Sequence, residues 1–228
     1  MTNDQGFAPF KTSRPRAAVS WSGGKDCCLA LMRAAESYEI VAMVTMFGED
    51  GTRSRSHGLT PAVIRAQAER LSLPVYLERC SWPTYTDQYS ALLAQAKQHD
   101  VTHVIFGDIL GETHREWNER VCARNELTAV MPLWGESTLL LAQDFIARGG
   151  DARFVTVRPP LLDETWLGQK LDLETLTRLQ SAGADPCGEL GEYHTVVTNC
   201  PAFSSPLTLK SGRQVLSNGC YAIDFTVA

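Results

Sequence analysis

A short glycine-rich segment near the N-terminus carries the clearest chemistry in the chain. Residues Ser20–Cys27 read Ser-Trp-Ser-Gly-Gly-Lys-Asp-Cys, between an apolar run and a segment of helical periodicity. Gly23 and Gly24 let backbone N–H groups approach an anion closely, and the N-terminus of a helix attracts negative charge. The Ser22 hydroxyl can donate a hydrogen bond, and Lys25 adds a positive charge. The segment therefore predicts a phosphate-binding loop.

Two better-known nucleotide loops are absent from the sequence. Neither the Walker A pattern nor the G-x-G-x-x-G dinucleotide fingerprint occurs. A plain strand-to-helix turn, with glycines used only for geometry, is the alternative interpretation. Because Lys25 and Asp26 directly follow a Ser-Gly-Gly turn, the phosphate-binding interpretation is favoured.

Polar residues also follow two other apolar runs that we expect to be strands. The loop Gly48–His57 follows one of them, and Gly107-Asp108 follows the other. In open parallel sheets, ligands bind beyond the carboxyl ends of the strands. We therefore expect both segments and the glycine loop to open onto one crevice, although a turn or N-cap carboxylate is the alternative for Asp108.

A second group of reactive side chains lies in the glycine-punctuated stretch Gly188–Thr195. The carboxylates of Glu189 and Glu192 can bind an amine or ammonium or assist Mg²⁺, and His194 can move a proton. The alternative is a solvated acidic turn that leads into a strand. The glycines favour the functional interpretation, because functional residues concentrate on loops.

Composition excludes several classes of protein. The formal net charge is −5 over 228 residues, which argues against broad nucleic-acid binding because such binding needs a basic face. Seven cysteines without a Cys-x-x-Cys pair favour reduced thiols. Residues 1–16 lack the apolar run of a secretory signal, and no apolar stretch of ~18 residues occurs, so we expect a cytoplasmic protein without a secretory signal or a membrane span.

Apolar runs alternate with helix-period segments over the first 130 residues or so. This alternation predicts an α/β, Rossmann-like parallel sheet with helices on both faces. The expected strands are Ala17–Ser20, Ile40–Phe47, Pro74–Leu77, Val101–Phe106 and Leu127–Met131. The expected helices are Lys25–Ser37, one that begins at Thr60-Pro61, one over Tyr85–Ala96, and one with a capping box at Thr113–Glu116.

The last 95 residues or so have a different pattern, which predicts a smaller α+β domain. Helices are expected near Ser137–Arg148 and Asp172–Ala182, and β-type runs at Arg153–Val157, Val196–Thr198, Leu207–Leu209 and Tyr221–Val227. The expected organisation is a flexible tail over residues 1–16, a nucleotide domain over 17–132 and a substrate-recognition domain over 133–228.

The glycine loop resembles a known superfamily. Ser22-Gly23-Gly24-Lys25-Asp26 is similar to the PP-loop of the adenine nucleotide α-hydrolases, in which the loop holds pyrophosphate while a substrate attacks the α-phosphate. Cys27 stands where that loop usually has serine. A thiol is the weaker hydrogen-bond donor, so this one phosphate contact differs from the superfamily pattern.

Further segments resemble the diphthine–ammonia ligase family across about residues 17–205. They are Val44–Phe47, Ser56–Leu59, Phe106–Ile109, Arg120–Cys122 with Pro132–Trp134, and Gly188–Thr195. The resemblance implies a ligase that adenylates a carboxylate, releases pyrophosphate and transfers ammonia to the mixed anhydride. In such a reaction the protein mainly supplies positioning and charge neutralisation.

The resemblance also implies roles for particular residues. Lys25, Asp26, Glu189, Glu192 and His194 are the expected catalytic residues. Mg²⁺ is expected on the phosphates, mainly held by substrate oxygens and water, with Asp26 as the candidate protein ligand. ATP is expected to contact Ser20, Ser22, Gly23, Gly24, Lys25, Asp26, Cys27, Thr45, Phe47, His57, Gly107 and Asp108.

The acceptor and the other partners stay open at this point. In eukaryotic and archaeal members the acceptor is diphthine, a modified histidine on an elongation factor. Cys27-Cys28 and His57-Gly58-Leu59 also resemble bacterial members, for which another small carboxylate, such as a cobalamin-related acid, is the alternative. An ammonia donor is needed, and a homodimer is compatible with the sequence.

Two other functions are weighed against the ligase. An RNA-modifying thiolase of the same superfamily would need suitably placed catalytic cysteines and a basic surface, which the net charge of −5 disfavours. An ATP- or AMP-binding module without turnover is the third interpretation. The presence of Lys25-Asp26 and the Gly188–Thr195 segment disfavours it.

Overall fold

The N-terminal half of the molecule is built on a parallel sheet. The computed structural model describes residues 14–228. Its five parallel strands follow the order β3-β2-β1-β4-β5, which places β1 in the centre. The strands are β1 (Arg16–Ser20), β2 (Glu39–Phe47), β3 (Val75–Arg79), β4 (His103–Ile105) and β5 (Thr128–Val130).

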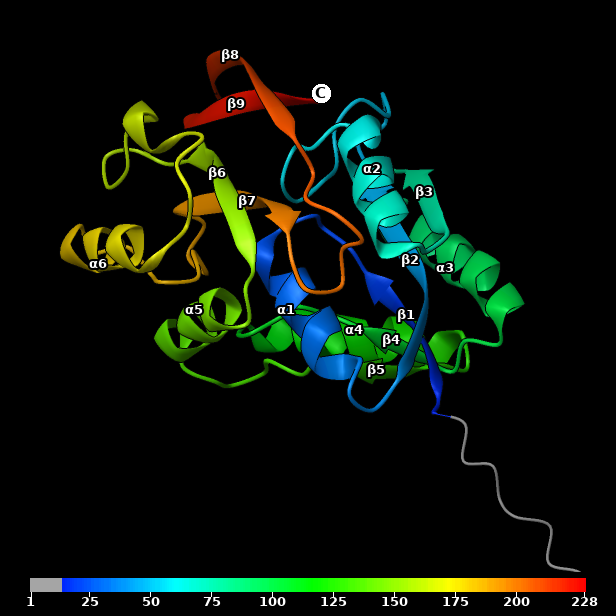
Figure 1. Cartoon of the computed structure of the whole chain (residues 1–228). Coiled ribbons are helices and arrows are strands. Elements are labelled where there is room, and N and C mark those ends of the chain that lie inside the picture. The colour runs from blue at the N-terminus through cyan, green and yellow to red at the C-terminus, as the bar shows by residue number, and fades with distance from the viewer. Residues whose placement is uncertain (1–13) are drawn as a thin grey trace, which may run out of the picture.

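Helices cover both faces of this sheet (Figure 1). In β1, Ala17 and Val19 pack in one apolar core with α1 (Lys25–Ala34) and α2 (Pro61–Leu71). Ala18 points to the opposite core, with α3 (Tyr85–Ala96) and α4 (Glu112–Arg124). This alternation is the period-2 pattern of a strand buried on both sides. The expected α/β, Rossmann-like fold is confirmed.

The C-terminal half contains a separate antiparallel sheet in the order β7-β6-β9-β8. Its helices lie beside that sheet in Figure 1. The strands are β6 (Asp151–Val157), β7 (Tyr193–Asn199), β8 (Leu209–Ser217) and β9 (Cys220–Val227), and the helices are α5 (Thr138–Ala147) and α6 (Leu173–Ser181). Short 3₁₀ turns occupy η1 (Lys97–His99) and η2 (Glu164–Trp166).

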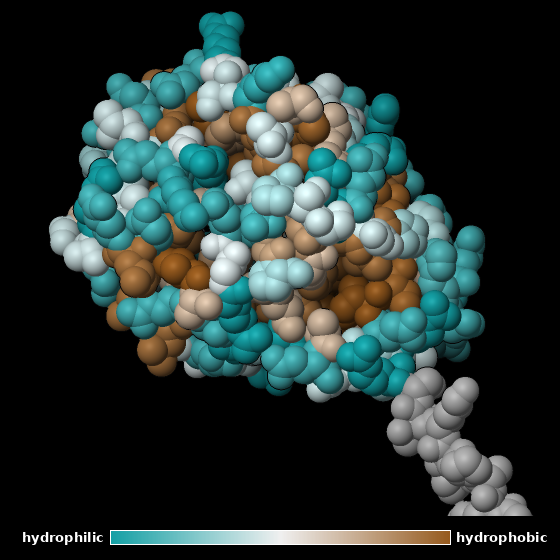
Figure 2. Space-filling model, viewed as in Figure 1, coloured by the Kyte–Doolittle hydropathy of each residue, from teal (hydrophilic) through white to brown (hydrophobic). Residues whose placement is uncertain are grey.

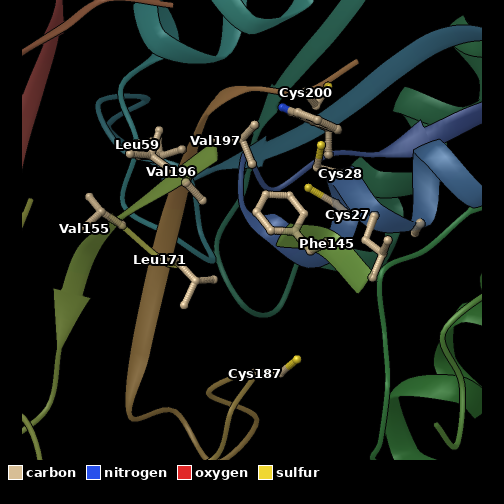
Figure 3. Close-up of a cluster of buried hydrophobic side chains, with 14 of the residues drawn as sticks. Cys27, Cys28, Leu59, Phe145, Val155, Leu171, Cys187, Val196, Val197 and Cys200 are labelled. Atoms are coloured by element: carbon tan, nitrogen blue, oxygen red, sulfur yellow. The ribbon is translucent and has the colours of Figure 1, made fainter. Parts of the chain in front are cut away.

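The two halves share one hydrophobic core. Figure 3 shows Cys27 and Cys28 at the start of α1 facing the cluster that contains Val196, Val197 and Phe145. All five side chains are at most 3% exposed. Apolar burial of this extent stabilises the arrangement in which β7 lies against the head of α1.

Hydrophilic side chains cover much of the face seen in Figure 2, with apolar residues showing between them. Within residues 14–228, no helix has the length and apolar character needed to cross a bilayer.

Some details differ from the sequence-based expectations. The predicted Thr113 cap is wrong, because α4 begins at Glu112 and its N-cap is Gly111, so Thr113 lies inside the first turn. Strand β8 extends to Ser217, whereas only its first residue fell in a predicted run. Of the predicted tail, residues 1–13 lie outside the described part, and β1 already begins at Arg16. The domain boundary between residues 132 and 133 stays a prediction.

One buried amide ties the glycine loop to both of its neighbours. Gln67 of α2 is fully buried, and its Oε1 accepts a hydrogen bond from Trp21 Nε1 at 2.8 Å. Its Nε2 donates to the carbonyls of Gly23, at 3.0 Å, and Val197, at 2.8 Å. The Val197 amide in turn donates to the Gly23 carbonyl at 2.8 Å. The loop is therefore held between α2 and β7.

Replacing Gln67 with methionine tests this network. We expect Gln67→Met to lower the free energy of unfolding by about 2–4 kcal/mol, because it leaves buried polar groups on Trp21 and Val197 without partners. Urea unfolding measures the difference. The control is Gln98→Met at an exposed position, for which we expect a change within about 0.5 kcal/mol. Equal effects of the two substitutions would contradict the role given to Gln67.

Candidate active site

A pocket of about 660 Å³ lies at the carboxyl ends of β1, β2 and β4. The three segments expected to meet do contribute to it, and the C-terminal half closes one side. The sequence-predicted residues that line it are Ser20, Ser22, Lys25, Asp26, Cys27, Thr45, His57, Gly107, Asp108, Glu189 and His194. Gly23, Gly24, Phe47 and Glu192 are not among the lining residues.

The head of α1 opens onto this pocket without a capping side chain. Its N-cap is Gly24, which makes no side-chain cap. The Lys25 amide donates to Thr195 Oγ1 of β7 at 3.1 Å. The next two amides, those of Asp26 and Cys27, meet no acceptor among the described residues. An anion would find free N–H donors there, at the positive end of the helix dipole.

Lys25 connects the two halves of the site. Its side chain is buried, and its ammonium group contacts Asp26 Oδ2 at 2.9 Å and the carbonyl oxygen of Cys187. It also lies 4.9 Å from the centroid of the Tyr193 ring. Burial opposes the charge, but Asp26 and the other nearby groups raise the pKa of Lys25 well above its ordinary value. Lys25 is therefore positively charged, and its contacts hold the ammonium group in one position.

The glycines of the loop act by permitting close packing. A Cβ on Gly24 would overlap the His57 ring, and a Cβ on Gly107 would overlap the backbone of Asp26 and Cys27. Gly23 has a φ of +87°, in the left-handed region that favours glycine. The structure thus explains Gly23 and Gly24 by geometry, although neither lines the pocket.

Two half-buried histidines stack against each other beside the loop. The rings of His57 and His194 are 4.7 Å apart with an angle of 29° between them. His57 Nδ1 lies 2.7 Å from the Thr195 carbonyl oxygen. Burial lowers the pKa of His57 to about 4 and that of His194 to about 3. Both rings are therefore neutral at pH 7, and they contribute hydrogen bonds and shape rather than charge.

Three carboxylates line the pocket: Asp26 belongs to the loop, and Asp108 and Glu189 lie beyond it. Asp108 Oδ2 accepts a hydrogen bond from Asn118 Nδ2 at 3.0 Å, and burial raises the pKa of Asp108. Burial and the charge of Asp26 raise the pKa of Glu189 to about 7. A carboxyl group with such a pKa can take up and release a proton near neutral pH.

Two of the predicted site residues have other tasks. The Glu192 carboxylate is buried and accepts hydrogen bonds from the amides of Asp185, at 2.8 Å, and Leu190, at 3.0 Å, so it braces its own loop. Phe47 is a core residue that is 2% exposed. The Glu192 side chain is therefore held by hydrogen bonds within its own loop, and the Phe47 side chain is part of the hydrophobic core.

The Cys27 thiol also braces the loop from within. Cys27 Sγ donates to the Gly24 carbonyl at 3.1 Å and accepts from the Ser22 hydroxyl at 3.2 Å. Burial raises the pKa of the thiol, which keeps it protonated. The backbone amide of Cys27 is therefore available to a ligand, while its side chain stays buried in hydrogen bonds within the loop.

Sequence reasoning missed one wall of the pocket. Trp82, Tyr85, Tyr89 and Trp117 line it together. Trp82 is 72% exposed. Tyr85 and Tyr89 are one helical turn apart in α3, and both pack against Trp117, at 5.3 and 5.0 Å between ring centroids. In the sequence, this wall was indicated only by the spacing of Trp82, Tyr85 and Tyr89 directly after the third predicted strand.

The described residues do not form a complete metal site. No group of three or more His, Cys, Asp or Glu side chains in residues 14–228 is arranged to hold a metal ion. Asp26 offers one carboxylate next to the free amides. One carboxylate fits an Mg²⁺ ion that takes its other ligands from phosphates and water.

The pH dependence of stability tests the environment of Glu189. Its pKa is raised from 4.5 to about 7 in the folded protein, so the folded state binds more protons than the unfolded state between these values. Glu189 therefore makes the free energy of unfolding fall as the pH rises through this window. We expect Glu189→Gln to remove this fall in urea titrations at several pH values. Exposed Glu164→Gln is the matched control; an unchanged profile for Glu189→Gln would contradict the assignment.

Comparisons with known proteins add relatives of moderate similarity. A diphthine–ammonia ligase from Rattus norvegicus is 29% identical, over 88% of this chain and 85% of the relative. The Homo sapiens protein of the same name is 27% identical with the same coverage. The one from Schizosaccharomyces pombe is 29% identical over 82% of this chain, which spans only 35% of that longer protein.

Family models cover most of the chain. The model described as diphthamide synthase N-terminal domain matches residues 15–129. The one described as diphthamide synthase C-terminal domain matches residues 137–227. The two matches together take in the glycine loop, the pocket and the antiparallel sheet. The chain therefore belongs to the diphthamide synthase family.

Proposed function

We propose that this protein is an ATP-dependent ligase that adenylates a carboxylate and converts it to an amide, as the name diphthine–ammonia ligase of its relatives suggests. The observation that carries the proposal is the uncapped head of α1. Two free amides, the Ser22 hydroxyl and the Lys25 charge surround one end of a pocket that also contains Glu189.

In this proposal the β- and γ-phosphates of ATP lie against the first turn of α1. The amides of Asp26 and Cys27 donate to them, and the fixed charge of Lys25 stabilises the pyrophosphate as it leaves. Lys25 is paired with Asp26 at 2.9 Å, so it does not neutralise the phosphates alone. Mg²⁺, held by phosphate oxygens and the Asp26 carboxylate, would supply the remaining positive charge.

The rest of the pocket suits the two acyl-transfer steps. A carboxylate oxygen of the acceptor attacks the α-phosphorus, and the bond to pyrophosphate breaks. Ammonia then attacks the acyl carbon, and AMP leaves. Glu189, with a pKa of about 7, is the best-placed group to take up a proton, whereas the neutral His194 orients ligands by hydrogen bonding.

The acceptor and the organisation around it are part of the same proposal. A diphthine-bearing protein is the first candidate acceptor, and a small carboxylic acid is the second. We propose that residues 17–132 bind the nucleotide and that residues 133–228 select the acceptor. Trp82 is 72% exposed, with the Arg55 guanidinium 4.3 Å from its ring centroid, and its exposed surface offers a contact for an apolar part of either ligand.

Exchange of pyrophosphate into ATP tests the first half of the reaction. We expect radioactive pyrophosphate to enter ATP only when a suitable carboxylate is present, in a screen of diphthine-bearing elongation factor and small acids. Lys25→Ala should reduce the exchange rate by a factor of about 100 or more, because it removes the charge that faces the leaving group. The control Lys210→Ala changes an exposed lysine outside the pocket and should keep the full rate.

Circular dichroism and thermal unfolding of both variants check that Lys25→Ala is folded. Ser22→Ala provides a second, milder probe of the same loop and should reduce exchange by about tenfold. ATP binding without any acceptor-dependent exchange would instead favour the non-catalytic nucleotide-binding module.

A further inference from the structure

A carboxylate outside the pocket holds the backbone that carries two of the groups in the pocket. Asp185 is not among the lining residues, whereas Cys187 and Glu189, which follow it closely in the sequence, are. Asp185 Oδ1 accepts hydrogen bonds from the Cys187 amide, at 2.8 Å, and from the Glu189 amide, at 3.2 Å. This is the local pattern in which an aspartate side chain fixes the backbone that follows it. One oxygen atom thus holds both ends of the stretch from Cys187 to Glu189.

The second oxygen of the same carboxylate ties this stretch to a helix. Asp185 Oδ2 accepts a hydrogen bond from the hydroxyl of Thr138, the first residue of α5, at 2.7 Å. The Thr138 carbonyl accepts from the Cys187 thiol at 3.2 Å, and the Asp185 amide donates to the Glu192 carboxylate at 2.8 Å. Asp185 therefore anchors the stretch both on α5 and within its own loop.

The Cys187 carbonyl passes this anchoring on to the glycine loop. It accepts a hydrogen bond from the Lys25 ammonium group, which also contacts Asp26 Oδ2 at 2.9 Å. A lysine side chain is long and flexible, so its charge is placed only as well as the acceptors that hold it. Because Asp185 fixes Cys187 through the amide of that residue, it acts on the position of the Lys25 charge without touching Lys25.

Glu189 depends on the same carboxylate in two ways. Its backbone amide bonds to Asp185, while its side chain lines the pocket. Burial raises the pKa of Glu189 to about 7, helped by the charge of Asp26 and opposed by that of Lys25. The charges of Asp185 and Asp108 raise this pKa further. Asp185 therefore holds the backbone of Glu189 and also favours the protonated form of its side chain.

We propose that Asp185 is a positioning residue that holds the Lys25 ammonium and the Glu189 carboxyl in place together. This inference rests on the proposed ligase function and adds to it a residue outside the pocket. In that function Lys25 faces the departing pyrophosphate and Glu189 takes up a proton, so both must be held in position for the reaction. Asp185 meets this need because it bonds to the residue that holds Lys25 and to Glu189 itself.

Two substitutions separate the hydrogen bonds of Asp185 from its charge. In Asp185→Asn the amide oxygen can still accept from the Cys187 and Glu189 amides, and the amide nitrogen can donate to the Thr138 hydroxyl. We expect pyrophosphate exchange within about threefold of wild type. Asp185→Ala removes all of these bonds and should lower the exchange rate by about tenfold or more. Its KM for ATP should stay within about threefold, because the free amides at the head of α1 remain.

The matched control is Asp163→Ala. Asp163 is exposed and lies outside the pocket, and its carboxylate likewise accepts a hydrogen bond from a backbone amide that follows it, that of Thr165, at 3.0 Å. This substitution should leave the exchange rate unchanged. A full exchange rate in Asp185→Ala would overturn the positioning role. Equal losses in Asp185→Ala and Asp185→Asn would also overturn it, because the retained hydrogen bonds would then have no effect.

NMR of the full chain tests the same role without turnover. Hydrogen exchange of the Cys187 and Glu189 amides should stay slow in Asp185→Asn and become faster by about tenfold or more in Asp185→Ala. The titration midpoint of the Glu189 carboxyl should move to lower pH in Asp185→Asn, because a negative charge is removed. This midpoint decides the question if Asp185→Ala does not fold.

The two levels of the proposal fail in different ways. Unchanged amide exchange in Asp185→Ala, or an unchanged Glu189 midpoint in Asp185→Asn, would overturn the role given to Asp185. Absence of acceptor-dependent pyrophosphate exchange in the wild-type protein would instead overturn the ligase.

Discussion

The first turn of α1 presents backbone N–H groups that no side chain of the loop caps, because its N-cap residue is Gly24. Among residues 14–228, the Lys25 amide is the one donor of this turn that a residue outside the loop satisfies, and it bonds to Thr195 Oγ1 of β7 at 3.1 Å. The amides of Asp26 and Cys27 stay free within the described residues. An exposed helix head of this kind is costly unless an anion or water pairs with it, so this local constraint determines where a phosphate can bind.

The C-terminal half contributes directly to the proposed phosphate site. Strand β7 provides Thr195 and Val197, which hold the loop at the Lys25 and Gly23 ends. The loop between α6 and β7 provides the carbonyl that fixes the Lys25 ammonium, together with Glu189. Because both halves share one core, a change in the C-terminal half can reach the glycine loop through these few contacts.

Much of the fold followed from the sequence, because strands buried on both faces leave continuous apolar runs such as residues 40–47. Thr60 and Pro61 marked the start of α2, and Asp172 capped α6. The predicted Thr113 cap was wrong, because the capping-box pattern does not reveal that the helix already begins at Glu112, after Gly111. Strand β8 was missed because its residues are mainly polar and exposed.

The candidate site was predictable where short motifs carry the geometry. The loop residues Ser22, Lys25 and Asp26, together with Asp108 and Glu189, do meet at one pocket. Sequence alone did not show that Glu192 turns toward its own loop, since that depends on the backbone amides it meets after folding. It also did not show that Tyr89 and Trp117, from two different helices, form one wall.

A crystal structure of the full chain with a non-hydrolysable ATP analogue and Mg²⁺ tests the central claim most directly. We expect the β- and γ-phosphate oxygens within hydrogen-bond distance of the Asp26 and Cys27 amides and of Ser22 Oγ, with Lys25 still buried against the Cys187 carbonyl. Density for the nucleotide at another place, with residues 22–27 free of ligand, would contradict it.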